Sequence, residues 1–259
     1  MAEKLLTLGC DPELAIIGKA GIALPARNFL AGGTQGRVGT DASGIQAELR
    51  PGVALNAIDL AVRCRMALNE LRELLAPYYT DGSIRKTIGG SFARMEVAIG
   101  GHVHIGGLTP NQIPSFTEWA DHLGHIWWTK VESAKSINSR TALAYGRPSD
   151  VRNQPHGIEY RTLGSWMSSP KVAVAAISLI HLAAELALRE IKPTSNSWIK
   201  EVKELREKEL IPKTCRIGID RAEELYGIGP INMKGDVIET WKLIKDSLPK
   251  QAIPADIED

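Results

Sequence analysis

The segment GGHVHIGG, residues 100–107, is the most informative part of the chain. Its two histidines, His102 and His104, are two residues apart, so in an extended strand both side chains point to the same face of a sheet. The glycine pairs on either side let another backbone or a ligand approach closely. The segment therefore predicts a strand that presents two imidazoles on one face.

Three other segments place polar residues two apart around an apolar or neutral residue: DPE (residues 11–13), QAELR (residues 46–50) and EYR (residues 159–161). Each segment alone is more often simply a strand that faces solvent, and a His-x-His pair alone is a weak signal. Their joint occurrence in glycine-flanked strands favours a shared site. Glu13, Glu48, Glu159 and His102 on one concave face would form a carboxylate-rich cavity, which suits a hard divalent cation such as Mg²⁺ bound together with phosphates.

The order of the elements predicts the fold class. Short apolar runs and glycines fill the first fifty residues, and a helical period then runs from Asn56 to Pro77. We expect a strand at 92–105, a helix at 115–137, a polar loop at 138–157, a strand at 158–162, a helix at 171–191, and charged helices after 194. Because the strands precede the helices without regular alternation, the sequence favours an α+β fold over a doubly wound parallel one. Neither a Walker pattern nor GxGxxG occurs, so the usual nucleotide-binding loops are absent.

Composition excludes several classes of protein. Lys and Arg number 31 against 30 Asp and Glu, so charge gives no reason to expect binding to nucleic acid or to an anionic membrane. The three cysteines form no Cys-x-x-Cys pair, which argues against a disulfide framework or a structural zinc site. The N-terminal residues lack the apolar region of a signal peptide. The apolar run 171–191 carries His181, Glu185, Arg189 and Glu190, so we expect a buried helix and a cytoplasmic protein.

The order of the motifs GCDPEL, TDASGIQAELRP, GGHVHIGG and IEYRTLGSWM resembles that of the phage-type carboxylate–amine ligases. These are small amidoligases of the glutamine synthetase and glutamate–cysteine ligase superfamily. The match covers residues 5–170, and the helical carboxyl-terminal part, residues 171–259, contributes little to it. The resemblance implies a single catalytic domain over residues 1–259, with a glutamine-synthetase-like curved antiparallel sheet and helices packed on its convex face.

The resemblance also implies how the polar residues bind metal and nucleotide. The positions that match the metal ligands of the superfamily are Glu13, Asp41, Glu48, His102 and Glu159. His104 would lie near the metal and the nucleotide. The implied cofactors are ATP and Mg²⁺ or Mn²⁺. Whether Asp11 or Glu96 also binds the metal is left open, and Asp41 is one methylene shorter than Glu, which makes direct contact there less secure.

Cations must hold the γ-phosphate while it is transferred. We assign this role to Arg161 and then to Arg152 or Arg147, with Arg147 and Arg161 also placed beside the nucleotide. Arg50 shares a face with Glu48 and could bind either a phosphate or a substrate carboxylate.

The implied reaction phosphorylates a carboxylate with ATP and lets an amine displace phosphate from the acyl phosphate, leaving an amide. A guanidino-kinase-like phosphotransferase of the same fold is one alternative. Another is a catalytically inactive nucleotide- or metal-binding protein, or a virion-associated one. The expected partners are small-molecule or peptide carboxylates and amines, with no nucleic acid and no membrane. Their identity and the oligomeric state are left open, and the phage-type motifs also suit a viral or prophage origin.

Overall fold

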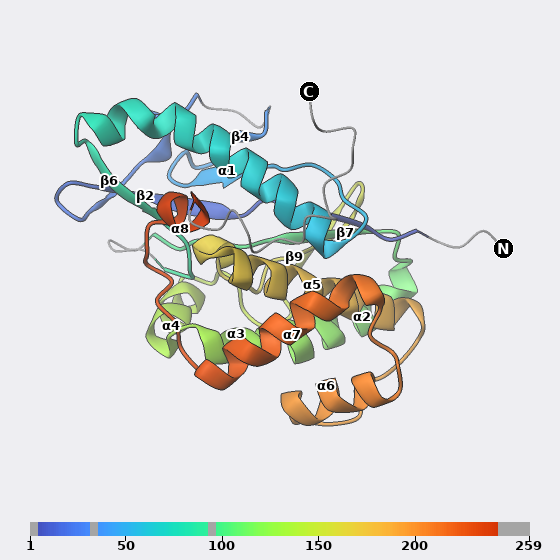
Figure 1. Ribbon diagram of the computed structural model, residues 1–259. Helices are drawn as coiled ribbons and strands as arrows, with labels where there is room; N and C mark the ends of the chain where they lie inside the picture. Colours follow the sequence, from blue (N-terminus) through green and yellow to red (C-terminus); the bar gives the residue numbers. More distant parts are fainter. Residues whose placement is uncertain (1–4, 32–35, 93–96, 243–259) are drawn as a thin grey trace.

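The computed structural model describes residues 5–31, 36–92 and 97–242 of the 259-residue chain. Its strands form two antiparallel sheets, and helices pack against them (Figure 1). Strands and helices do not alternate as in a doubly wound protein, because the sheets contain only antiparallel pairs among the described strands. This arrangement agrees with the predicted α+β class.

The first sheet has four strands in the order β1-β7-β9-β8, namely Thr7–Cys10, Val103–Gly106, Gly157–Tyr160 and Val151–Gln154. Its register places Arg152, Glu159, His104 and Gly9 in one row across the sheet. Residues directly opposite each other on antiparallel strands lie within reach of each other's side chains. The row therefore brings polar side chains of β7, β8 and β9 together.

The second sheet follows the order β3-β2-β5-β4, and β6 also pairs with β2. Its strands are β2 (Glu13–Gly18), β3 (Ala23–Leu24), β4 (Val38–Thr40), β5 (Ala47–Leu49) and β6 (Ile84–Ile88). Only Asp11 and Pro12 separate β1 from β2, and the Glu13 N–H donates to the Gly100 carbonyl (2.8 Å). The two sheets therefore meet at the Asp11–Glu13 segment.

The helices are α1 (Ala57–Thr80), α2 (Ile113–Ala120), α3 (Ile126–Val131), α4 (Ala134–Ala142), α5 (Pro170–Leu188), α6 (Trp198–Glu207), α7 (Lys213–Ile228) and α8 (Val237–Lys242). Single 3-10 turns occur at Ala26–Asn28, Pro110–Gln112 and Trp166–Ser168, and a π-turn at Asp121–His125.

Helix α5 is the centre of the hydrophobic core and packs against α1, α2 and α7 (Figure 1). Within the described residues it is the one helix long and apolar enough to cross a membrane by length and composition. However, 83% of its most apolar window is buried inside the structure. The prediction of a buried helix at 171–191 is confirmed, and His181 is only 3% exposed.

The predicted long strand over residues 92–105 is wrong. Only β7 is a ladder strand there, Phe92 and Ala98 form an isolated bridge, and residues 93–96, with the candidate Glu96, lie outside the described chain. Before β7, Gly100 forms only an isolated bridge with Gly164, and its N–H donates to the Glu13 carboxylate (2.6 Å).

The predicted helix over 115–137 is interrupted, and the predicted loop over 138–157 is partly regular. The chain turns extended at Glu132 (φ −114°, ψ 155°), and the buried Glu132 carboxylate accepts the Ser91 N–H (2.8 Å) and hydroxyl. Helix α4 then occupies the start of the expected loop, and β8 pairs with β9 at its end. The sequence did not indicate β8, because an edge strand with exposed side chains has the polar composition of a loop.

Helix α1 begins as predicted but runs beyond Pro77. Its N-cap is Asn56, whose side chain accepts the Asp59 N–H (2.9 Å). Proline removes one helix hydrogen bond, yet the helix continues to Thr80. The last turn is stabilised by the Thr80 hydroxyl, which donates to Ala76 O (2.9 Å), and by the Asp81 N–H, which donates to Pro77 O (3.0 Å).

Candidate functional site

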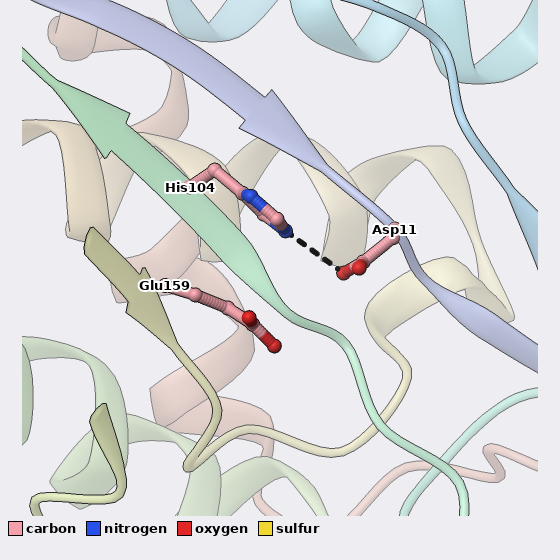
Figure 2. Close-up of side chains that lie close together, drawn as sticks. All are labelled: Asp11, His104 and Glu159. Atoms are coloured by element: carbon pink, nitrogen blue, oxygen red, sulfur yellow. Dashed lines mark ion pairs between the residues drawn. The ribbon is translucent and has the colours of Figure 1, made fainter. Parts of the chain in front are cut away.

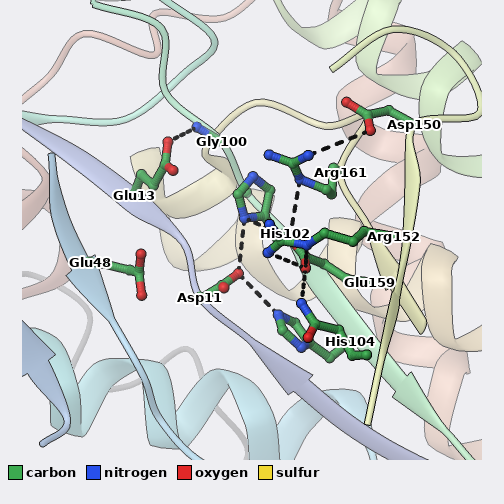
Figure 3. A network of polar contacts seen from close by, with 12 residues as sticks. Asp11, Glu13, Glu48, Gly100, His102, His104, Asp150, Arg152, Glu159 and Arg161 are labelled. Carbon is green, nitrogen blue, oxygen red and sulfur yellow. Dashed lines mark hydrogen bonds and ion pairs between the residues drawn. The ribbon is translucent and has the colours of Figure 1, made fainter. Parts of the chain in front are cut away.

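Asp11 stands at the junction of β1 and β2 with its carboxylate between two imidazoles (Figure 3). Its Oδ1 lies 3.1 Å from His102 Nδ1 and 3.2 Å from His104 Nε2. Burial alone would raise the pKa of Asp11, but the two imidazoles outweigh burial and hold that pKa well below its usual range. Asp11 is therefore an anion that orients both histidines of the His-x-His strand.

Asp11, His104 and Glu159 form a possible metal-binding group, in which one ligand atom from each residue lies within 4.8 Å of the others (Figure 2). The register pair His104–Glu159 on β7 and β9 creates this proximity. His104 Nε2 and Glu159 Oε1 are buried. Apart from ion-pair contacts, with Asp11 for His104 Nε2 and with His102 and Arg161 for Glu159 Oε1, neither atom has a hydrogen-bond partner among the described atoms. Two carboxylates and an imidazole gathered in this way fit a divalent cation.

Glu159 is fully buried and surrounded by positive charge. Its Oε2 accepts from Arg152 Nε (2.7 Å) and Gln154 Nε2 (2.6 Å), and Arg161 Nε lies 3.2 Å from its Oε1. Arg161 also reaches toward Asp150, at 3.8 Å (Figure 3). The site therefore holds two guanidinium groups beside the group that could bind a cation.

Glu13 and His102 meet at a residue that the sequence did not indicate, Tyr145. Glu13 Oε2 accepts the Gly100 N–H, and Glu13 Oε1 accepts the Tyr145 hydroxyl (3.0 Å). The same hydroxyl oxygen is 2.5 Å from His102 Nε2. Burial raises the pKa of Glu13, with the charge of His102 opposing that effect, and burial together with Glu13 raises the pKa of Tyr145. Tyr145 stands in the segment predicted as a polar loop, where no spacing signals its role.

Tyr145 is held in place by the buried Arg140 of α4. The Arg140 guanidinium lies 4.3 Å from the centre of the Tyr145 ring and donates to the carbonyls of Thr162 (2.6 Å) and Arg161 (2.9 Å). Gly146 follows with φ 65°, and a Cβ there would collide with the guanidinium. Arg140 thus ties the Tyr145 segment to the end of β9.

Glu48 faces the same region from β5, opposite Glu13 in the register and near Asp11 in Figure 3. Burial raises the pKa of Glu48 to about 7, repulsion from Asp11 adds to the rise, and Arg50 opposes it. Arg50 Nε is 2.7 Å from Glu48, its Nη2 donates to Thr40 O (2.7 Å), and its buried Nη1 has no hydrogen-bond partner among the described atoms.

A cavity of about 390 Å³ opens beside these groups. Asp11, Glu48, Arg50 and His104 line it, together with Gly9 and the exposed His156. His104 Nδ1 is 2.8 Å from His156 Nε2, and the two rings stack. The cavity could therefore receive a ligand with an anionic end near Arg50.

Two sequence candidates lie outside this network. The Asp41 carboxylate accepts the backbone N–H groups of Ser43, Ile45 and Gln46, so it closes the turn between β4 and β5. The side chain of Arg147 is exposed and makes no ion pair among the described residues. In contrast, Asp11 belongs to the network. It is two residues before Glu13, and this spacing alone could have marked Asp11 as a candidate metal ligand.

Comparison with known proteins gives one family match. A family model described as "Phage phiEco32-like COOH.NH2 ligase-type 2" matches residues 8–204. No curated protein matches the chain.

Two solved structures are similar in outline. A bifunctional glutathione synthetase from Pasteurella multocida is 11% identical with a TM-score of 0.47, over 93% of this chain and 49% of that one. A novel glutamine synthase homolog is 15% identical with a TM-score of 0.40, over 86% of this chain and 67% of that one. The chain spans about half the length of the glutathione synthetase. Neither likeness is close enough to carry the argument.

Proposed function

The chain belongs to the phage phiEco32-like COOH.NH2 ligase family, type 2, and we propose that it is an ATP- and Mg²⁺-dependent ligase that forms an amide from a carboxylate and an amine. The observation that supports this proposal most is the network around Asp11, in which side chains from β7, β9 and the β1–β2 junction touch. Carboxylates, imidazoles and guanidinium groups together are what a cation and phosphates require.

We assign divalent-cation binding to two adjoining groups of residues. One is Asp11, His104 and Glu159, and the other is Glu13, Glu48 and His102. When bound, Mg²⁺ or Mn²⁺ would neutralise phosphate oxygens of ATP. Asp41 is left out because its carboxylate already accepts three backbone N–H groups.

The arginines would hold the phosphates and the substrate. Arg161 and Arg152 flank Glu159, so their guanidinium groups can stabilise charge on the γ-phosphate during transfer. The unpartnered Nη1 of Arg50 is available for an oxygen of a phosphate or of a substrate carboxylate. His104, in the cavity wall, would contact the nucleotide, and Arg147 would reach it only from the exposed loop.

The reaction would proceed by attack of the substrate carboxylate on the γ-phosphate, with ADP as the leaving group. An amine would then displace phosphate from the acyl phosphate. These steps need positioned charge more than a protein nucleophile. We further propose that the sheets correspond to a glutamine-synthetase-like curved sheet, that residues 1–259 form one catalytic domain, and that it acts in the cytoplasm on small-molecule or peptide substrates.

Hydroxylamine trapping tests the reaction without knowledge of the natural amine. The protein is incubated with ATP, Mg²⁺, hydroxylamine and pools of carboxylic acids, and both ADP and hydroxamates are measured. We expect ADP release that depends on one pool and matches hydroxamate formation, because hydroxylamine intercepts an acyl phosphate. Glu159→Gln should lose both products.

Each of the other outcomes would support a different function for this protein. Phosphorylated guanidines without hydroxamates, from a parallel pool of guanidino compounds, would support the kinase alternative. Absence of both products, combined with metal-dependent ATP binding in calorimetry, would support an inactive binding protein. Equal hydroxamate formation by Glu159→Gln would contradict the assignment of the site.

A further inference from the structure

The Tyr145 hydroxyl occupies the point shared by two residues that we assign to the cation. Its oxygen is 3.0 Å from Glu13 Oε1 and 2.5 Å from His102 Nε2. A phenol has one proton, so when His102 carries its own proton on Nδ1 the hydroxyl can donate to only one of these two groups at a time. The hydroxyl therefore links Glu13 and His102 without satisfying both.

The other atoms of these residues are already engaged. His102 Nδ1 faces Asp11 Oδ1 at 3.1 Å and Glu159 Oε1 at 3.4 Å, so its N–H belongs on Nδ1 and the lone pair on Nε2. A carboxylate on one ring nitrogen is the usual partner of a histidine that binds metal through the other. Glu13 Oε2 likewise accepts the Gly100 N–H. The lone pair of His102 Nε2 and one lone pair of Glu13 Oε1 therefore both face Tyr145.

We propose that Tyr145 is a gate to the Glu13–His102 part of the metal site, and that a divalent cation binds these two residues only when the hydroxyl withdraws. The inference rests on the proposed metal site and concerns a residue that neither the motifs nor the family match assigns. Tyr145 would act on the site by competing with the cation for the same two lone pairs.

Contacts on the segment that carries Tyr145 hold the ring in one position, although the segment lies at the protein surface. Tyr145 lies between two residues with positive φ, Ala144 (57°) and Gly146 (65°). Arg140 holds the ring from one side at 4.3 Å, and the Arg161 guanidinium lies 5.2 Å from its centre. The flanking residues 142–144 and 147–149 are exposed and Tyr145 is half-buried, so the segment lies at the protein surface and outside the hydrophobic core.

Mn²⁺ affinity without nucleotide tests the proposal, measured as free Mn²⁺ by electron paramagnetic resonance. Tyr145→Phe keeps the ring and its contact with Arg140 but removes the competing hydroxyl. We expect Tyr145→Phe to bind Mn²⁺ about threefold to tenfold more tightly than the wild type, the effect of removing one competing hydrogen bond. Tyr160→Phe is the matched control, because the Tyr160 hydroxyl donates to Asp121 (2.7 Å), away from the metal residues. Its Mn²⁺ affinity should equal that of the wild type.

Equal or weaker Mn²⁺ binding by Tyr145→Phe would overturn the gate, since the hydroxyl would then hold the ligands in place instead of competing. Absence of Mn²⁺ binding in both proteins would overturn it as well. Tighter Mn²⁺ binding by Tyr145→Phe, with unchanged binding by Tyr160→Phe, would support the gate.

A spectroscopic measurement that keeps the Tyr145 hydroxyl gives an independent result. 3-Fluorotyrosine at position 145 should show a change in ¹⁹F chemical shift when Mg²⁺ is added, because the ring leaves Glu13 and His102. An unchanged resonance at saturating Mg²⁺ would contradict the gate. Both measurements omit ATP and substrates, so a failed ligase assay with a positive Mn²⁺ result would overturn the proposed reaction and leave the gate standing.

Discussion

Glu13 on β2 and Glu48 on β5 lie directly opposite each other in antiparallel register. Like charges in this relationship repel, and burial raises the pKa of both carboxyls, that of Glu48 to about 7. Arg50 Nε, 2.7 Å from Glu48, relieves only part of the repulsion. The pair therefore costs the fold stability and favours any cation that binds between the two strands.

Glu48→Gln removes one of the two facing charges. We expect the metal-free variant to melt at the same temperature as the wild type or about 2 °C higher, because the lost repulsion offsets the lost pair with Arg50. Mn²⁺ affinity should fall at least about tenfold. Differential scanning fluorimetry and Mn²⁺ titration measure the two effects. Glu207→Gln, on an exposed pair with Lys203, should change neither. A clearly lower melting temperature in Glu48→Gln would mean that the Arg50 pair outweighs the repulsion.

Arg161→Lys tests the proposed role of Arg161 in holding the γ-phosphate. Lysine keeps the charge but lacks the planar fork, so we expect a similar fold and similar MgATP affinity with turnover reduced by about tenfold to a thousandfold. Calorimetry with MgATP and ADP release with the active carboxylate pool provide the measurements. Arg206→Lys, in the surface pairs with Asp220 and Glu223, is the control. Wild-type turnover in Arg161→Lys would limit the residue to an ion pair with Glu159.

His181 makes stability depend on pH. Burial lowers the pKa of His181, but Cys215 at 3.4 Å and Glu185 at 3.6 Å outweigh burial and raise it from 6.5 to about 9. The folded state thus favours the protonated ring. Its contribution is fully present below pH 6.5 and is lost as the pH rises to about 9. Urea unfolding at pH 6 and pH 9 should show about 1 to 3 kcal/mol more loss in the wild type than in His181→Gln. Parallel pH curves for the two proteins would contradict this assignment.

Gly146→Ala tests how tightly Arg140 holds the Tyr145 segment. Both Gly146 (φ 65°) and Gly82 (φ 76°) have a left-handed backbone, so alanine should cost about 1 kcal/mol at either position. Only at Gly146 would the added Cβ meet the Arg140 guanidinium, while it meets nothing within 4 Å at Gly82. The free energy of unfolding should therefore fall further in Gly146→Ala than in Gly82→Ala. Equal losses would show that the guanidinium moves aside freely.

The sequence predicted which segments bring the candidate residues together, because the period of two in a pleated strand is fixed by geometry. It did not separate Asp11 from Asp41, since the path of the backbone decides whether a carboxylate faces histidines or closes a turn. Tyr145 was missed for a similar reason. Its role depends on contacts with Glu13 and His102, which are 132 and 43 residues away in sequence, and no local pattern encodes such contacts. Before β7, Gly100 donates to another distant group, the Glu13 carboxylate, and this contact also leaves no local signal.

The pairing of Glu159 with Arg152 would make metal binding at the proposed site an exchange of cations. The carboxylate is fully buried, whereas the Arg152 side chain on the edge strand is 53% exposed. A divalent cation that takes Glu159 would displace a guanidinium into water, so loading would swap one positive charge for another. Added salt would then act in two opposing directions, since it loosens the exposed arginine and also screens the incoming cation. Metal uptake should consequently vary less with ionic strength than the number of acidic residues suggests.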